Sequence, residues 1–159
     1  MDSNTEKTPE IRITYLDKPF ITETNCRSII IQSLYFYNSQ GHGIRFTNAD
    51  HIKIQGCLLE SLGQKGIVIG NERVISIENF TSVNQGCSGG TKNEVVACDF
   101  LHLGQGVVLI CDGNRIRLEK AENLVSNYYF NDYSRIIRTY SPAIKSISCG
   151  SLIYKHPDP

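Results

Sequence analysis

A short phrase of alternating apolar and polar residues repeats along the chain at a nearly constant interval. Residues 27–46 and 50–69 have the same order of apolar pair, polar bend and Gly-Ile ending, displaced by 23 residues. Repetition at a period in the low twenties is typical of proteins that stack one structural unit on the next. An apolar pair with a spacing of five residues recurs in five places: Ile29/Leu34, Ile52/Cys57, Ile75/Phe80, Val95/Phe100 and Val125/Phe130.

Each repeat is expected to be a coil of short strands rather than a helix. The apolar residues alternate with polar ones, and glycines interrupt the runs before a helical period could develop. One coil cannot enclose a core, so several coils must stack, with strand above strand at about 4.8 Å. The predicted fold class is all-β, a right-handed parallel β-helix solenoid of about five to six coils. A leucine-rich repeat is the alternative solenoid, but its LxxLxLxxN phrase does not occur.

The repeat also divides the chain into predicted segments. The predicted coils are residues 27–46, 50–69, 73–90, 93–109 and 123–146, with the two members of each apolar pair in two inward columns. We expect a polar N-terminal arm at 1–10, a β-helix domain at 11–153 with a loop insertion at 111–122, and a C-terminal tail at 154–159. Asn93 and Asn123 precede the last two coils at equivalent places, which predicts a ladder of asparagines there.

The balance of charges argues against one broad class of partner. Sixteen basic residues equal sixteen acidic ones, so bulk charge gives no attraction for nucleic acid. No apolar run approaches the about 20 residues of a membrane-spanning helix, so no membrane partner is expected. The first ten residues are polar and lack the apolar centre of a secretion signal. As written, the chain is expected in the cytosol, and a secreted location is expected if it is a fragment of a longer secreted protein.

The cysteines and histidines predict neither a metal site nor a cofactor. Six cysteines occur without a CxxC pair, and the four histidines are scattered. Cys57 stands in the apolar part of its coil, so the thiols are expected to be free, buried and packed like small apolar side chains. No group of acidic residues suited to Ca²⁺ is visible in the sequence.

The segment 123–144 contains the most specific motif of the chain. It resembles a phrase of the carbohydrate-active right-handed β-helix proteins, the pectate-lyase-like superfamily, and within it the glycosidase-type β-helix repeat proteins. The resemblance covers about residues 27–150 for the coils and about thirty residues for the phrase. The matching residues are Asn123, Val125, Asn127, Phe130, Asp132-Tyr133-Ser134-Arg135, Arg138-Thr139-Tyr140 and Pro142-Ala143-Ile144.

This resemblance implies a carbohydrate-associated β-helix domain with a polysaccharide or oligosaccharide as its partner. The resembled proteins have a histidine at the place of Asn131, and they continue with further coils that contribute acidic catalytic residues. We therefore expect a fragment or divergent copy of a glycoside hydrolase or polysaccharide lyase that lacks a complete active site. The alternatives are a non-catalytic structural or interaction solenoid without a glycan ligand, and a competent small hydrolase.

A carbohydrate site is expected at the corner that contains this motif. Arg135 and Arg138 offer planar groups for carboxylates such as those of uronic acids. Tyr133 and Tyr140 offer a flat ring face and a hydroxyl. These four residues are the predicted substrate-binding set. The alternative is that Arg138 and Tyr140 brace the corner through hydrogen bonds to the loop backbone.

Asp132 is the predicted catalytic residue because it adjoins these arginines and tyrosines. Hydrolysis of a glycosidic bond uses two carboxyl groups, and Asp112 and Glu119 are the other acidic candidates. The alternative for Asp132 is a residue that shapes the corner or forms an ion pair. His102 holds the same register position in the preceding coil and is expected to be a structural histidine.

The ends of such a stack present unpaired strand edges. Natural solenoids cap these edges, because an uncovered edge is a template for pairing with another chain. Residues 1–10 contain no amphipathic pattern suited to a cap, and Pro157 and Pro159 discourage pairing at the other terminus. End-to-end self-association of the chain is therefore expected.

Overall fold

A computed structural model of the chain describes residues 11, 13–70, 89–111, 120–147 and 152–155. These residues form fourteen short strands, and no helix occurs among them. The strands are β1 (Ile21–Thr24), β2 (Ile30–Gln32), β3 (Tyr35–Ser39), β4 (Ile44–Thr47), β5 (Lys53–Gln55), β6 (Leu58–Leu62), β7 (Ile67–Ile69), β8 (Glu94–Val96), β9 (Asp99–Leu101), β10 (Val108–Ile110), β11 (Asn123–Ser126), β12 (Tyr129–Asn131), β13 (Ile144–Ser146) and β14 (Leu152–Lys155).

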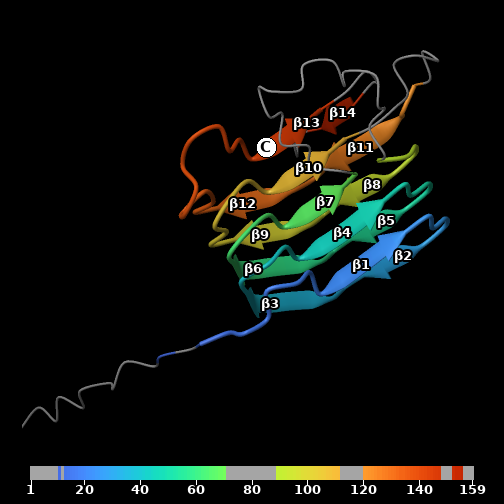
Figure 1. Cartoon of the computed structure of the whole chain (residues 1–159). Helices are drawn as coiled ribbons and strands as arrows, with labels where there is room; N and C mark the ends of the chain where they lie inside the picture. Colours follow the sequence, from blue (N-terminus) through green and yellow to red (C-terminus); the bar gives the residue numbers. More distant parts are fainter. Residues whose placement is uncertain (1–10, 12, 71–88, 112–119, 148–151, 156–159) are drawn as a thin grey trace, which may run out of the picture.

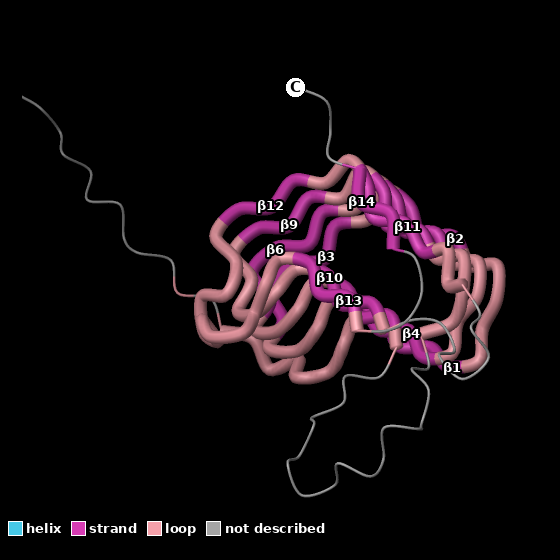
Figure 2. The backbone as a smooth tube through the Cα atoms, turned by 90° about the horizontal axis from the view of Figure 1, so that it is seen from above, coloured by secondary structure: helices cyan, strands magenta, loops and turns pink. Residues whose placement is uncertain are grey.

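The strands assemble into three parallel sheets that form the walls of a solenoid. The sheet orders are β1-β4-β7-β10-β13, β14-β11-β8-β5-β2 and β12-β9-β6-β3, so each strand pairs with its equivalent in the next coil. Figure 1 shows the coils stacked one above another, and Figure 2 shows the three walls around a common interior. The predicted all-β parallel solenoid is confirmed.

Four complete coils are present among the described residues, fewer than the predicted five or six. They are β2–β4, β5–β7, β8–β10 and β11–β13, with β1 before and β14 after them. The predicted coil at 73–90 lies almost entirely outside the described residues. The strands on its two sides pair directly, β5 with β8, β6 with β9 and β7 with β10. Two consecutive coils of the stack are therefore separated by 41 residues, as in the pairing of Ile54 with Val95.

Because of this 41-residue separation, the predicted columns of inward residues are wrong by two residues between β5 and β8. The 23-residue displacement is confirmed where Ile44 pairs with Ile67, and the 30-residue displacement is confirmed where Phe100 pairs with Phe130. Between them, Val95 lies beside Ile54 rather than in the column of Ile52. The predicted middle members Ile75 and Phe80 lie outside the described residues. The observed columns are Ile31, Ile54, Val95 and Val125 in one sheet and Phe36, Leu59, Phe100 and Phe130 in another.

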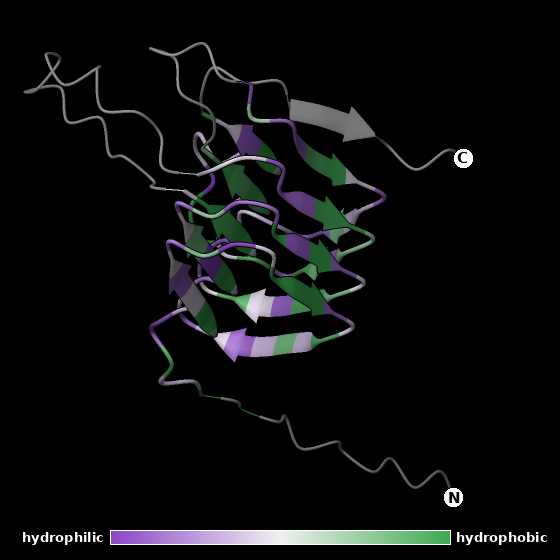
Figure 3. Cartoon of the chain, turned by 90° about the vertical axis from the view of Figure 1, so that its right-hand side faces the viewer, coloured by the Kyte–Doolittle hydropathy of each residue, from purple (hydrophilic) through white to green (hydrophobic). Residues whose placement is uncertain are grey.

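The inward side chains of the three sheets meet in one apolar core. Val95, Phe100, Leu59 and Ile67 are fully buried there, although they belong to different walls. Figure 3 shows the hydrophobic residues concentrated on the strands of the middle coils. Because alternate residues of a strand point to opposite sides, each short strand contributes one or two side chains to this core.

The described cysteines divide into free thiols and one disulfide-bonded residue. Cys57 and Cys98 are buried, and their Sγ atoms donate to the carbonyls of Ile31 and Ile54 in the preceding coil, at 3.9 and 3.6 Å. Burial raises the pKa of Cys98 to about 11. The expectation of free thiols is therefore confirmed for these two, but it is wrong for Cys111, which is disulfide-bonded.

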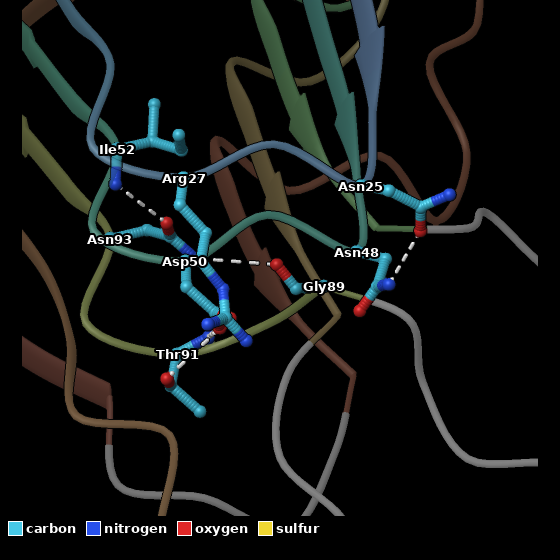
Figure 4. A network of polar contacts seen from close by, with 8 residues as sticks. All are labelled: Asn25, Arg27, Asn48, Asp50, Ile52, Gly89, Thr91 and Asn93. Carbon is cyan, nitrogen blue, oxygen red and sulfur yellow. Dashed lines mark hydrogen bonds and ion pairs between the residues drawn. The ribbon is translucent and has the colours of Figure 1, made fainter.

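A ladder of buried asparagines supports the corner before β5, β8 and β11. The side-chain oxygen of Asn93 accepts from the N–H of Ile52 at 3.0 Å, and its Nδ2 donates to the carbonyl of Gly89 at 3.2 Å. The oxygen of Asn123 in turn accepts from the N–H of Asn93 at 2.8 Å. Both side chains are fully buried, and Figure 4 shows how Asn93 connects two coils. The predicted asparagine ladder is confirmed.

Asp50 forms a second polar link at the same corner (Figure 4). Its carboxylate accepts from the N–H and hydroxyl of Thr91 at 2.9 and 3.1 Å and pairs with Arg27 Nε at 3.2 Å. Partial burial works to raise the pKa of Asp50, but the Thr91 hydrogen bonds and the charges of Arg27 and His51 outweigh it. The pKa of Asp50 therefore lies below its ordinary value of 3.8.

The Asp50→Asn variant is expected to be less stable at neutral pH by about 1–2 kcal/mol, because hydrogen bonds to a charged group are lost. The folded-state pKa is depressed, so the carboxylate contributes its full stabilisation above pH 3.8 and loses it as pH falls through the lower, folded value. Urea unfolding at pH 7 and at progressively lower pH should show the difference from wild type shrinking on acidification. Asp99→Asn, at an exposed position of β9, is the control. A difference that stays constant with pH would contradict this account.

Candidate functional site

A column of residues in the left-handed conformation lies where the strands of the β12-β9-β6-β3 sheet end. Asn38, Ser61, His102 and Asp132 have φ values of 57°, 54°, 54° and 53°. Few residues other than glycine adopt this conformation, which turns the chain sharply. The register of the sheet places these four residues one above another. The residues that directly precede them pair in succession, Tyr37 with Glu60, Glu60 with Leu101 and Leu101 with Asn131.

Asp132 links two of the side chains at this corner. Its Oδ2 lies 2.9 Å from Nδ1 of His102 and 3.3 Å from Nε of Arg135. The three side chains are about half exposed, at 48%, 43% and 53% in the order Asp132, His102 and Arg135. Ion pairs exposed to this extent contribute about 0–1 kcal/mol, so this group orients side chains more than it stabilises the fold. The ion-pairing interpretation of Asp132 and its shared register with His102 are both confirmed.

A groove with a volume of about 1220 Å³ lies along this corner. It receives side chains from all four coils, beginning near Thr14 and Ser39 and ending near Ser141. Its floor includes Gly63 and Gly104, whose backbones stack closely: a Cβ added to Gly104 would lie 2.1 Å from the carbonyl oxygen of Gly63. A side chain at position 104 would therefore clash with the backbone of the neighbouring coil.

Four of the five predicted site residues line this groove. They are Asp132, Tyr133, Arg135 and Arg138. Tyr133 also packs edge-on against Phe130, with ring centroids 5.3 Å apart, so its ring is held against the end of the core. The motif therefore does bring an acid, two guanidinium groups and one aromatic ring to one open surface.

Tyr140 does not line the groove. Its side chain is 95% exposed, and it borders a smaller hollow of about 150 Å³ that also contacts Lys65 and Lys145. Neither Tyr140 nor Arg138 donates a side-chain hydrogen bond to the described part of the chain, so the bracing interpretation of these two residues is wrong there. Asp112 and Glu119 lie outside the described residues.

Sequence reasoning missed several groove residues that precede the motif. Ser61, Gln64 and Gln105 line the groove from the middle coils. Gln105 Oε1 accepts from Nζ of the buried Lys65 at 2.7 Å, which ties two coils together beside the groove. The signal that could have found Ser61 is its place two residues after Leu59, because His102 and Asp132 follow the core phenylalanines by the same distance.

The described residues contain no group of three or more His, Cys, Asp or Glu that could hold a metal ion. Over the same residues, no helix has the length and apolar character that crossing a membrane requires. Comparison of the chain with family models, curated proteins and solved structures finds no match. The fold and the site together define a parallel β-solenoid with a polar groove across its coils.

Proposed function

We propose that this solenoid is a carbohydrate-associated domain that binds an acidic polysaccharide or oligosaccharide in the groove. The observation that carries the proposal is the guanidinium group of Arg138, which borders the groove and has no ion pair or hydrogen bond within the described part of the chain. Arg135 is already paired with Asp132, so Arg138 leaves a net positive charge among the described lining residues. A planar guanidinium binds a carboxylate through two parallel hydrogen bonds.

The shape of the groove supports a ligand that is extended. Its lining groups come from four coils stacked at about 4.8 Å intervals, so a chain laid along it meets equivalent polar groups in succession. Gln64 and Gln105 hold such equivalent places on consecutive coils, and each amide can both donate and accept. Alternating hydroxyls and carboxylates along a uronic acid polymer match these groups chemically.

The groove supports binding of the carbohydrate without hydrolysis of its glycosidic bonds. Glycosidases use two carboxyl groups separated by about 5–9.5 Å. Among the described residues that line the groove, Asp132 is the one carboxylate, and it is committed to His102 and Arg135. We therefore assign Asp132 to organising the groove, with Arg138 and Tyr133 contacting the ligand.

The Arg138→Ala variant is expected to weaken binding of an oligogalacturonide by about tenfold or more, because the loss of one charge-assisted contact is about 1.4 kcal/mol or greater. Isothermal titration and NMR shift mapping measure this effect. Arg45→Ala, on β4 in another wall, is the matched control and should bind normally. Neutral oligosaccharides of the same length should bind more weakly than the acid form. Shift changes confined to the far end of the solenoid, or equal effects of both arginine variants, would contradict the proposal.

A structural or interaction role is the second candidate, and it is favoured by one end of the stack. In the described structure, β1, β2 and β3 each form the outermost strand of a sheet, and Ile30 and Leu34 there are 64% and 47% exposed. An exposed strand edge with apolar side chains is a template for association. Such contact between copies would extend the solenoid end to end.

Self-association is expected to depend on this edge. Light scattering during size-exclusion chromatography across a concentration series should show species larger than a monomer. Ile30→Lys should shift the distribution toward monomer, because a lysine on an edge strand opposes pairing. Gln55→Lys, at a partly exposed position on β5 with a paired strand on each side, is the control for an added charge. A monomer at every concentration would argue against this role.

A further inference from the structure

Three groove residues on consecutive coils have the chemistry of a hydrolytic triad. Ser61 lies within β6, His102 directly follows β9, and Asp132 directly follows β12. The histidine therefore lies between the serine and the aspartate, one strand spacing of about 4.8 Å from each. All three line the groove. We propose that Ser61, His102 and Asp132 hydrolyse acyl esters, with Ser61 as the nucleophile, an activity beyond the carbohydrate binding proposed above.

The contact between His102 and Asp132 sets the proton arrangement that a general base requires. Asp132 Oδ2 lies 2.9 Å from Nδ1 of His102. An ionised carboxylate can only accept, so Nδ1 carries the hydrogen and the lone pair of the neutral ring is on Nε2. This is the orientation in which an aspartate holds the histidine of a serine hydrolase.

The hydroxyl of Ser61 and Nε2 of His102 are both available for catalysis. Within the described part of the chain, neither Ser61 Oγ nor His102 Nε2 has a hydrogen-bond partner. By contrast, Ser39 and Ser134, which line the same groove, donate to the carbonyls of Leu16 and Ser141. Ser61 also has a φ of 54° within β6, so the chain bends sharply at the serine. Catalytic hydrogen bonds are often long in the free enzyme and shorten when substrate binds.

Two other residues that line the groove retain donors for the developing negative charge. Arg135 uses Nε for Asp132, which leaves its terminal guanidinium N–H groups at the groove. Gln105 accepts from Lys65 through Oε1, which leaves its amide NH₂ as a donor among the lining groups. Donors placed where charge develops supply the stabilisation of an oxyanion hole.

The reaction consists of two balanced acyl transfers. Ser61 Oγ bonds to the ester carbonyl carbon while its proton passes to His102 Nε2, and Asp132 stabilises the imidazolium. The carbon–oxygen bond to the alcohol then breaks, and the alcohol leaves with the proton from Nε2. Water next attacks the acyl-serine and gives a proton to Nε2. The bond to Oγ breaks, the carboxylic acid is released, and the proton returns to Ser61.

The test uses the full chain with a fluorophosphonate probe and with p-nitrophenyl acetate. Wild type should be labelled at Ser61, as located by peptide mass spectrometry, and should hydrolyse the ester above the buffer rate. Ser61→Ala should abolish labelling and reduce hydrolysis by about 100-fold or to background, and His102→Gln should do the same. Asp132→Asn should reduce the rate while Ser61 remains the labelled residue. Ser33→Ala, at an exposed serine with a φ of 55° at another corner, should behave as wild type.

Thermal melting checks that each variant keeps the wild-type fold, and oligogalacturonide binding is measured in parallel. Labelling that is lost in Ser61→Ala while glycan binding remains supports the triad. Labelling with no glycan binding also supports it and removes only the carbohydrate proposal. A wild-type chain that is neither labelled nor active, or labelling that survives in Ser61→Ala, overturns the triad and leaves the carbohydrate proposal standing.

Discussion

Replacing Phe100 with alanine is expected to lower the free energy of unfolding by about 3–5 kcal/mol, the range for truncating a buried aromatic side chain. Phe100 is fully buried in the column with Leu59 and Phe130. Its ring also packs against the backbone of Gly66, which directly precedes β7 in another sheet. A Cβ added to Gly66 would lie 2.7 Å from the ring. Alanine would leave a cavity between two sheets whose backbones are fixed by pairing on both sides.

Urea unfolding of Phe100→Ala should be compared with Tyr37→Ala. Tyr37 points outward from β3, where its ring lies 5.4 Å from that of Tyr35, and it is only partly buried. The expected loss for Tyr37→Ala is about 1 kcal/mol, near the centre of the distribution for point variants. Equal losses for the two variants would show that the inward and outward faces of this sheet are assigned wrongly, since a shift of one residue exchanges them.

Asn93→Ala is expected to destabilise the chain by about 2–4 kcal/mol, although it removes no apolar surface. The substitution leaves two buried backbone groups without their partner, the N–H of Ile52 and the carbonyl of Gly89. Each unsatisfied buried polar group is associated with a loss of about 1–3 kcal/mol. Asn93→Asp should also be harmful, because a carboxylate cannot donate to the Gly89 carbonyl.

Asn48→Ala is the matched control for this buried asparagine. Asn48 Nδ2 donates to Asn25 Oδ1 at 2.6 Å, but the pair is exposed, so water can replace the lost partner. Its removal should change the free energy of unfolding by less than about 1 kcal/mol. Comparable losses for Asn93→Ala and Asn48→Ala in the same urea series would mean that burial does not govern the strength of this ladder.

The coil pattern was predictable from the sequence wherever the repeat length stays constant. Local alternation indicates which residues form strands, and the 23-residue and 30-residue displacements identify neighbours correctly. The junction between Ile54 and Val95 was not predictable in this way. Alternation at Ile75 and Phe80 satisfies the same local pattern. Which strand pairs with which is decided by hydrogen bonding in three dimensions, and periodicity alone does not encode it.

The residues of the candidate site that are close together in the sequence could be predicted, and those from distant coils could not. Asp132, Tyr133, Arg135 and Arg138 fall within one motif, so their proximity followed from chain connectivity. Ser61 belongs to the coil β5–β7, and His102 belongs to the coil β8–β10. Their proximity follows from the 41-residue displacement between β6 and β9, which the repeat length did not predict. The exposure of Tyr140 depends on the corner geometry around its φ of 53°, which no sequence pattern specified.

The close approach of Gly70 and Gly89 gives the solenoid a point for engineered grafting. A Cβ built on Gly70 would lie only 3.1 Å from Cα of Gly89, so these two residues lie side by side although they are far apart in the sequence. The entropy of closing a flexible loop changes by only about 0.6 kcal/mol for each doubling of its length. The coils on both sides pair with each other directly. A foreign peptide joined between these two glycines should therefore leave the pairing of the coils on both sides as it is.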